Sequence, residues 1–118
     1  MIVKQEKIDK PWGYEIIWSK CKKFVGKILY INKGNKLSRQ YHNIKEETIF
    51  VQEGSLLVEV GSKEYKEDIY LKPGESLHIT PNTIHRFCAL KNDVTLFEVS
   101  TPELNDVVRL EDDYNRVN

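Results

Sequence analysis

The chain lacks an excess of charge of either sign, because 18 Lys and Arg residues balance 18 Asp and Glu residues among its 118 residues. A protein with so weak an overall field has no basic stripe that could neutralise the phosphates of a nucleic acid. Long hydrophobic runs are missing too, and no stretch approaches the roughly 20 apolar residues of a membrane-spanning helix. We therefore expect neither a nucleic acid nor a membrane as a partner.

Cysteine is also scarce. Cys21 and Cys88 are the only cysteines, and neither belongs to a CxxC pair. A chain of this length forms one domain whose core is large enough to fold without disulfides, so two free thiols are expected. The first ten residues, MIVKQEKIDK, lack the apolar run of a signal peptide. These features predict a single-domain soluble protein in the cytoplasm.

What the chain does contain is a regular alternation of turn residues with short runs rich in β-branched and aromatic residues. Turns recur roughly every 8 to 12 residues without any long helical periodicity, which predicts an all-β sandwich or barrel. The only helical turn that we expect lies near Leu104–Val108. The predicted strands are Val25–Ile31, Leu37–His42, Thr48–Gln52, Leu56–Val60, Tyr65–Leu71, Leu77–Thr80, Ile84–Leu90 and Val94–Thr101. A small closed β-fold leaves an interior or a mouth in which a small ligand can be held.

One predicted strand carries an unusual row of polar residues. Successive side chains of a strand point to opposite faces, so Gln40 and His42 share one face. Lys36 and Ser38 lie on the same face, and Leu37 takes the other. A polar row that points inward is costly unless it binds something. We therefore expect this face to line a water-filled cavity.

Two more residues complete a candidate metal site with Gln40 and His42. Glu47 stands at the polar end of the next strand, and His85 enters a strand after a turn at Pro81–Asn82. Two imidazoles, one carboxylate and one amide oxygen form a set of nitrogen and oxygen ligands that suits Zn, Mn, Fe, Co or Ni. The spacing alone leaves open that the histidines are surface residues or hydrogen-bonded core residues. The joint placement of four candidate ligands beside turns favours the metal site.

The spacing of these residues resembles the first sequence motif of the cupin family. In that motif a glycine is followed after five residues by HxH, after three or four more by Glu, and after another six by Gly. Here the matching positions hold Gly34, Gln40-Tyr41-His42, Glu47 and Gly54. The second cupin motif is matched more loosely, by Pro73, Gly74 and His85, with departures at Thr80, Asn82 and Ala89.

The cupin resemblance implies a fold and a set of metal ligands. The fold is an all-β, single-domain cupin jelly-roll β-barrel over residues 1–118, with the barrel at about 14–101 and a C-terminal tail at 102–118. The metal ligands of the family fall on Gln40, His42, Glu47 and His85.

Further features narrow the resemblance to the type II mannose-6-phosphate isomerases. Gln40 replaces the first histidine of the cupin motif, within the sequence SRQYH. The segments Lys10–Glu15 (KPWGYE) and Asp106–Arg116 (DVVRLEDDYNR) also agree with that cupin domain. The resemblance implies a metal-dependent aldose–ketose isomerase that acts on a sugar phosphate, with one divalent ion (Zn, Mn, Fe, Co or Ni) and a homodimeric assembly.

Candidate catalytic and substrate-binding residues surround the predicted metal site. Lys36 is a candidate to hold the sugar phosphate or to stabilise an enediolate, and Ser38 on the same face is a candidate substrate contact. Glu98 is the candidate base for proton transfer at C2. In the family resemblance the tail folds over the cavity, where Arg116 would clamp the phosphate. For Lys36, Glu98 and Arg116 the sequence leaves open a solvated lysine, an outward-facing glutamate and a frayed terminus, respectively.

Two other functions remain open. A non-catalytic metal-bound sugar-binding or regulatory cupin would share the fold and the ion, and the departures in the second motif favour it. A non-haem iron oxygenase would use two histidines and one carboxylate as its metal ligands. In that case Gln40 as a fourth ligand would fill a coordination position that oxygen chemistry needs open.

Overall fold

The computed structural model describes residues 1–117, and this range contains strands and no helix. The strands are β1 (Glu6–Lys10), β2 (Gly13–Lys20), β3 (Val25–Ile31), β4 (Asn35–Lys36), β5 (Arg39–Tyr41), β6 (Glu47–Glu53), β7 (Leu56–Gly61), β8 (Lys66–Leu71), β9 (Ser76–Ile79), β10 (His85–Ala89), β11 (Val94–Ser100) and β12 (Val108–Glu111). The all-β prediction is confirmed. Within the same range, the structure holds no helix with the length and apolarity needed to cross a membrane.

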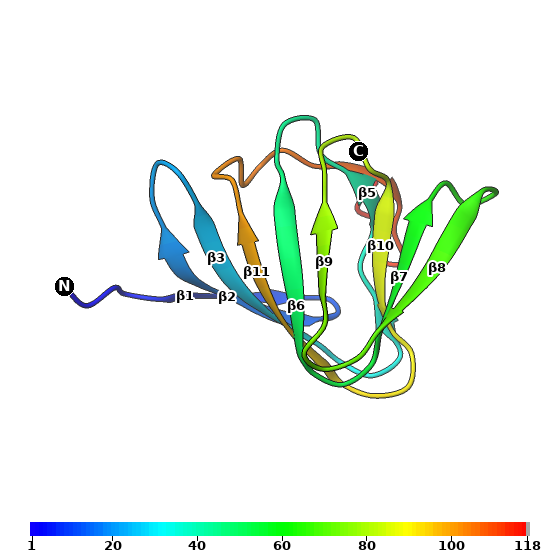
Figure 1. The fold of residues 1–118 in the computed structure, drawn as a ribbon, viewed down its shortest axis with the longest axis horizontal. Coiled ribbons are helices and arrows are strands. Elements are labelled where there is room, and N and C mark those ends of the chain that lie inside the picture. The colour runs from blue at the N-terminus through cyan, green and yellow to red at the C-terminus, as the bar shows by residue number, and fades with distance from the viewer. Residues whose placement is uncertain (118) are drawn as a thin grey trace.

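The strands form two antiparallel sheets that face each other (Figure 1). The first sheet has the order β1-β2-β3-β11-β6-β9, and the second has the order β12-β5-β10-β7-β8 with β4 paired to β10. Buried hydrophobic side chains from both sheets, such as Ile49, Leu96 and Val58, form one core cluster. This arrangement is the jelly roll that the sequence predicted.

Alternation along β6 and β11 brings acidic residues to the inner side of the first sheet. β6 buries Glu47 together with Ile49, and β11 buries Glu98 together with Leu96. Residues two apart on a strand share a face, and Glu98 pairs in register with Ile49 on the neighbouring strand. Two carboxylates therefore project into the same interior.

The predicted strand Leu37–His42 is interrupted in the structure. β4 and β5 are separated by Leu37 and Ser38, which belong to neither strand. The N–H of Leu37 donates a hydrogen bond to the carbonyl of Phe87, and the Leu37 side chain joins the core while Ser38 is buried as well. Because the break resets the alternation, the prediction that Lys36 and Ser38 share a face opposite Leu37 is wrong.

The ends of the chain contribute more strands than the sequence predicted. β2 pairs with β3 and forms a hairpin with β1, but a register shift between Ile17 and Ser19 interrupts its alternation and hides the strand in the sequence. The helical turn predicted at Leu104–Val108 is wrong, because residues 104 and 105 form a non-helical turn and β12, which pairs with β5, begins at Val108. Part of the segment expected as a tail, 102–118, is thereby built into the second sheet.

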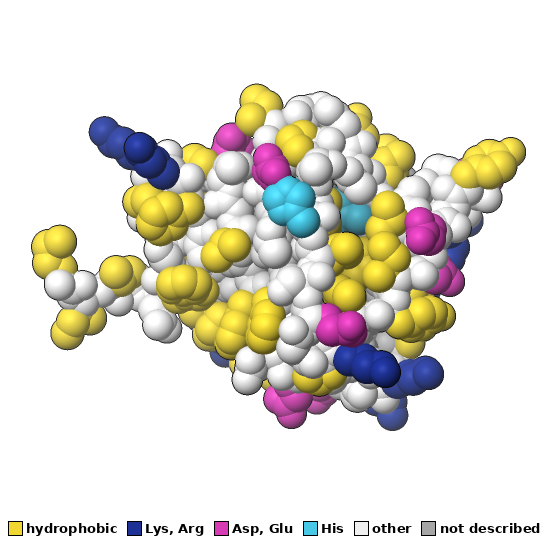
Figure 2. All heavy atoms as spheres, in the orientation of Figure 1, with side chains coloured by type: hydrophobic (Ala, Val, Ile, Leu, Met, Phe, Trp, Pro, Cys, Tyr) yellow, Lys and Arg dark blue, Asp and Glu magenta, His cyan; other side chains and the backbone are white. Residues whose placement is uncertain are grey.

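The outer side of the first sheet exposes several large apolar side chains. Figure 2 shows hydrophobic side chains spread over the face of the molecule that carries β3, β11 and β6. Phe97 and Val99 of β11 and Trp18 of β2 are exposed, and the Phe97 ring stacks on Phe50 of the neighbouring strand. Such cross-strand ring contacts stabilise a sheet face directly.

Gly54 and Gly74 form a matched pair for testing the turns. Both have a positive φ, 84° at Gly54 and 90° at Gly74, which is costly for any residue with a Cβ. A Cβ at Gly54 would collide with the carbonyl oxygen of Asp93, whereas a Cβ at Gly74 would meet nothing within 4 Å. We expect Gly54→Ala to lower the free energy of unfolding by at least about 2 kcal/mol and Gly74→Ala by about 1 kcal/mol, measured by urea unfolding. Equal losses would mean that backbone conformation alone sets the cost.

Candidate metal centre

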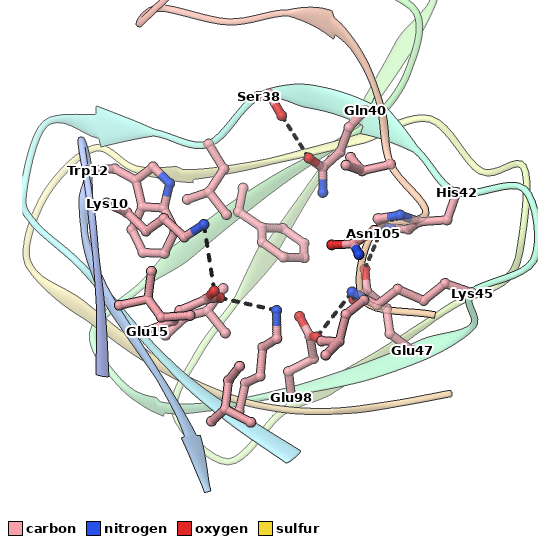
Figure 3. A pocket seen from close by; sticks show the side chains of 18 of the residues that line it. Lys10, Trp12, Glu15, Ser38, Gln40, His42, Lys45, Glu47, Glu98 and Asn105 are labelled. Atoms are coloured by element: carbon pink, nitrogen blue, oxygen red, sulfur yellow. Dashed lines mark hydrogen bonds and ion pairs between the residues drawn. The ribbon is translucent and has the colours of Figure 1, made fainter. Parts of the chain in front are cut away.

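The two sheets enclose a cavity of about 610 Å³, a size typical of small-molecule sites (Figure 3). Ser38, Gln40 and His42 line it from the second sheet and the segments beside it. Glu47 and Glu98 line it from the first sheet. The cavity is therefore the polar interior that the sequence predicted for a small ligand.

His42, Glu47 and His85 converge at one end of this interior. Glu47 Oε1 lies 3.6 Å from His42 Nε2 and 3.2 Å from His85 Nε2, and the three residues offer ligand atoms that all lie within 4.8 Å of one another. All three residues are buried, and none of these three atoms has a hydrogen-bond partner among residues 1–117. Buried polar atoms are rarely left unsatisfied, so this group of atoms can hold a metal ion.

Two backbone carbonyls orient the imidazoles. His42 Nδ1 lies 2.6 Å from the carbonyl oxygen of Asp106, and His85 Nδ1 lies 2.8 Å from that of Thr83. Because a carbonyl only accepts hydrogen bonds, this geometry assigns the ring proton to Nδ1 in both residues. The lone pair of each Nε2 then faces Glu47, as metal-bound histidines require.

Lys45 determines which oxygen of Glu47 faces the two histidines. Its ammonium lies 3.4 Å from Glu47 Oε2 and 3.3 Å from Glu98 Oε2, and it is itself buried. Burial alone would raise the pKa of Glu47, but the two histidines and Lys45 hold that pKa well below its usual range. The carboxylate is therefore ionised, with Oε2 turned to Lys45 and Oε1 turned to the imidazoles. Sequence reasoning missed Lys45, because a lysine within a charged loop gives no sign that it folds inward.

Gln40 lies beside the three buried ligand atoms. Gln40 of β5 stands in register with His85 of the neighbouring strand β10, and its side chain lines the cavity. Gln40 Oε1 accepts a hydrogen bond of 2.7 Å from Ser38 Oγ, so Ser38 fixes the amide group (Figure 3). The oxygen keeps a second lone pair, which leaves it able to act as a ligand.

Glu98 points into the cavity from β11 and is only 4 % exposed. Burial and the negative charge of Glu47 together raise the pKa of Glu98 to about 7, while Lys45 opposes the shift. The sequence had left an outward-facing glutamate open, and the structure shows an inward one. Its side chain lies close to Lys45 and Glu47 in Figure 3.

Of the two predicted phosphate contacts, Arg116 lines the cavity and Lys36 does not. Lys36 lies on β4 opposite Cys88 and is not part of the cavity lining, because the chain break after β4 turns it away. Arg116 does line the cavity, but its guanidinium already forms two hydrogen bonds with Asp112, of 2.8 and 3.2 Å. Arg109 of β12 also lines the cavity and was not predicted.

The third histidine lies outside the cluster. His78 of β9 is exposed, and its Nε2 lies 2.6 Å from a carboxylate oxygen of Glu46. Figure 2 shows an exposed histidine beside a carboxylate over this part of the first sheet. His78 thus takes no part in the candidate metal centre.

Asp106 connects the segment before β12 to the metal centre. Its carboxylate accepts hydrogen bonds from the backbone N–H groups of Asn43, Ile44 and Lys45, at 3.0, 2.7 and 2.9 Å. These bonds lower the pKa of Asp106 to about 2. Since its carbonyl also holds His42, one residue fixes both a histidine and the loop that carries Lys45. No local pattern indicates these contacts, because the partners lie more than 60 residues apart in the chain.

The family follows from a sequence comparison. A model of the family described as mannose-6-phosphate isomerase C-terminal matches residues 2–112. The chain belongs to this family, whose cupin fold the structure shows. Among curated proteins, none is significantly similar to the chain in sequence.

Solved structures support the cupin fold at low sequence identity. The capsular polysaccharide assembling protein CapF from Staphylococcus aureus superposes with a TM-score of 0.79 at 15% identity, over 92% of this chain and 34% of CapF. KdgF from Halomonas sp. gives 0.71 at 18% identity, over 85% of this chain and 90% of KdgF. Hydroxypropylphosphonic acid epoxidase from S. wedmorenis gives 0.71 at 21% identity, over 84% of this chain and 56% of the epoxidase. This chain therefore spans about a third of CapF and most of KdgF.

Asp106 should make the stability of the metal-free protein depend on pH in the acid range. A carboxyl whose pKa is lowered by folding stabilises the protein above its unfolded pKa, and this contribution is lost as the pH falls towards the folded pKa of about 2. We expect Asp106→Asn to unfold more easily at pH 5, and to lose less stability than the wild type between pH 5 and pH 2. Asp9→Asn, at an exposed position of β1, is the matched control. Parallel unfolding curves for Asp106→Asn and the wild type across this pH range would contradict the assignment.

Proposed function

We propose that this cupin domain is a metal-dependent isomerase that interconverts the aldose and ketose forms of a sugar phosphate, as a mannose-6-phosphate isomerase does. The observation that carries the proposal is the set of three buried, unpartnered ligand atoms of His42, Glu47 and His85 beside the inward carboxylate of Glu98. Membership in the mannose-6-phosphate isomerase C-terminal family supports the choice of reaction.

Four residues would hold a divalent ion at this centre. His42 and His85 would contribute Nε2, Glu47 would contribute Oε1, and Gln40 would contribute its amide oxygen. This set of nitrogen and oxygen donors suits Zn, Mn, Fe, Co or Ni. A bound ion would act as a Lewis acid that polarises the carbonyl and the neighbouring hydroxyl of the substrate.

Glu98 is the proposed catalytic base. Its carboxylate takes the proton from C2 of the aldose, the electron pair of the C–H bond forms the double bond of an enediol, and the same carboxyl returns the proton to C1. The hydroxyl proton on O2 moves to O1, so that the ketose has the composition of the aldose. Lys45 holds Glu98 in place for this transfer, since its ammonium contacts Glu98 and Glu47 together.

The cavity has a suitable size and charge for a phosphorylated sugar. Its volume of about 610 Å³ is within the range for small-molecule sites. Its lining contains more cations than carboxylates, with Lys10, Lys20, Lys27, Lys45, Arg109 and Arg116 against Glu6, Glu15, Glu47 and Glu98. A divalent ion would increase this positive excess, which favours an anionic ligand. The cytoplasmic location and the homodimer remain predictions.

A metal-bound sugar-binding cupin without catalysis is the second candidate. The departures from the second cupin motif at Thr80, Asn82 and Ala89 favour it, and Lys36 does not supply a phosphate contact in the cavity. This candidate shares the metal centre with the isomerase and differs in having no turnover.

Metal binding provides the first test. We expect His85→Ala to weaken Zn²⁺ or Co²⁺ binding by at least about 100-fold, because it removes a ligand from a buried centre. His78→Ala, which removes a histidine outside the cluster, is the matched control and should bind like the wild type. Titration calorimetry and the absorption spectrum of Co²⁺ measure the change. Similar affinities for the two variants would remove the support for the metal centre.

Turnover provides the second test. Protein loaded with Zn, Mn, Fe, Co or Ni is incubated with mannose 6-phosphate, and fructose 6-phosphate is measured. We expect turnover with at least one ion, and a loss of at least about 100-fold in kcat for Glu98→Gln with metal affinity unchanged. Metal binding without turnover with any of the five ions would contradict the isomerase and favour the sugar-binding cupin.

A further inference from the structure

Most cations of the cavity already have a carboxylate partner. Lys10 and Lys27 both contact Glu15, at 3.6 and 3.2 Å. Lys45 lies between two carboxylates, and Arg116 is bonded to Asp112. These side chains are occupied in holding the wall of the cavity.

Arg109 is different. It lines the cavity, its Nε is buried without a hydrogen-bond partner, and it forms no ion pair with any residue in the range 1–117. A guanidinium presents its N–H groups in a planar fork that matches a phosphate or carboxylate in a bidentate manner. Burying such a donor without a partner is costly, and an anionic ligand would supply the partner that residues 1–117 do not.

The strand register fixes where this partner would lie. Arg109 of β12 is paired with Gln40 of β5, which is paired in turn with His85 of β10. Residues in register on neighbouring strands point to the same face, and strands are about 4.8 Å apart. The backbone of Arg109 is thus roughly 10 Å from that of His85, in one row across the sheet.

We infer that Arg109, and not Arg116, is the anchor for the phosphate of the ligand. The inference rests on the proposed function for the identity of the substrate. Arg109 stands in the same row across the sheet as Gln40 and His85, so a ligand in the cavity can contact both the arginine and the candidate metal centre.

The test begins with inorganic phosphate as the probe. It is titrated by calorimetry into chelator-treated full-length protein, so that the metal centre plays no part. We expect Arg109→Met to weaken phosphate binding at least about tenfold, because two charge-assisted hydrogen bonds are lost. Arg109→Lys should recover part of the affinity, since it keeps the charge without the fork. Lys22→Met, at an exposed position outside the cavity, controls for the general loss of one positive charge.

Arg116→Met decides between the two arginines. The inference is supported when Arg109→Met loses clearly more affinity for phosphate than Arg116→Met, and it is overturned when the two lose equally, when Arg116→Met loses more, or when Arg109→Met binds like the wild type. Thermal melting checks that each variant is folded, and Arg109→Lys provides a second reading if Arg109→Met is not.

A sugar with and without its phosphate tests the anchor and separates this inference from the isomerase. Wild-type protein should bind mannose 6-phosphate at least about tenfold more tightly than mannose, and Arg109→Met should abolish this preference. Equal binding of the two sugars by the wild type overturns the inference. A protein that shows the preference but no turnover refutes the isomerase and leaves the anchor intact, whereas turnover with an unchanged KM in Arg109→Met refutes the anchor and leaves the isomerase intact.

Discussion

The rest of the site depends on the burial of one negative charge, the carboxylate of Glu47. An ionised group taken out of water costs several kcal/mol unless its surroundings compensate it. Lys45 compensates one oxygen, but the other faces two imidazoles whose ring protons are turned away to backbone carbonyls. Three electron-pair donors that converge with no hydrogen atom between them repel one another. A cation placed among them would remove this repulsion, which is why these three residues form a candidate metal centre.

The sequence predicted the parts of this centre that depend on local geometry. Gln40 and His42 are two residues apart, and His85 stands in register with Gln40. Strand alternation also brings Glu47 inward with Ile49, because β6 is continuous. The same reasoning failed for Lys36, since alternation holds only while the strand continues and the chain leaves the sheet at Leu37 and Ser38. The candidate ligands were identified by spacing and resemblance, whereas the convergence of His42, Glu47 and His85 is visible only in the folded structure.

The parts that the sequence could not predict depend on contacts between distant segments. In the sequence Lys45 is one charged residue among others in a loop. Its inward position depends on Asp106, which is distant in the chain and accepts hydrogen bonds from the N–H groups of that loop. Glu98 could be placed on a strand, but whether it faces a lysine or solvent depends on the neighbouring loop. Glu47 and Glu98 are therefore both positioned by Lys45, which compensates part of the energetic cost of burying them. A site of fixed charges of this kind stabilises a reacting group without reorganising.

The segment around β12 connects the outside of the second sheet to the cavity. On the outside, Glu111 pairs with the buried guanidinium of Arg39 at 3.0 Å. Arg109, two residues earlier, would share the face of Glu111 in a regular strand, but the register shifts between them. A bulge of this kind changes the direction of a side chain, so Arg109 can face inward beside Gln40 while Glu111 faces outward. The ion pairs of the outer face thus hold β12 against β5, and the irregularity within it turns an arginine towards the site. The same strand, β12, therefore both extends the second sheet beside β5 and brings Arg109 to the cavity.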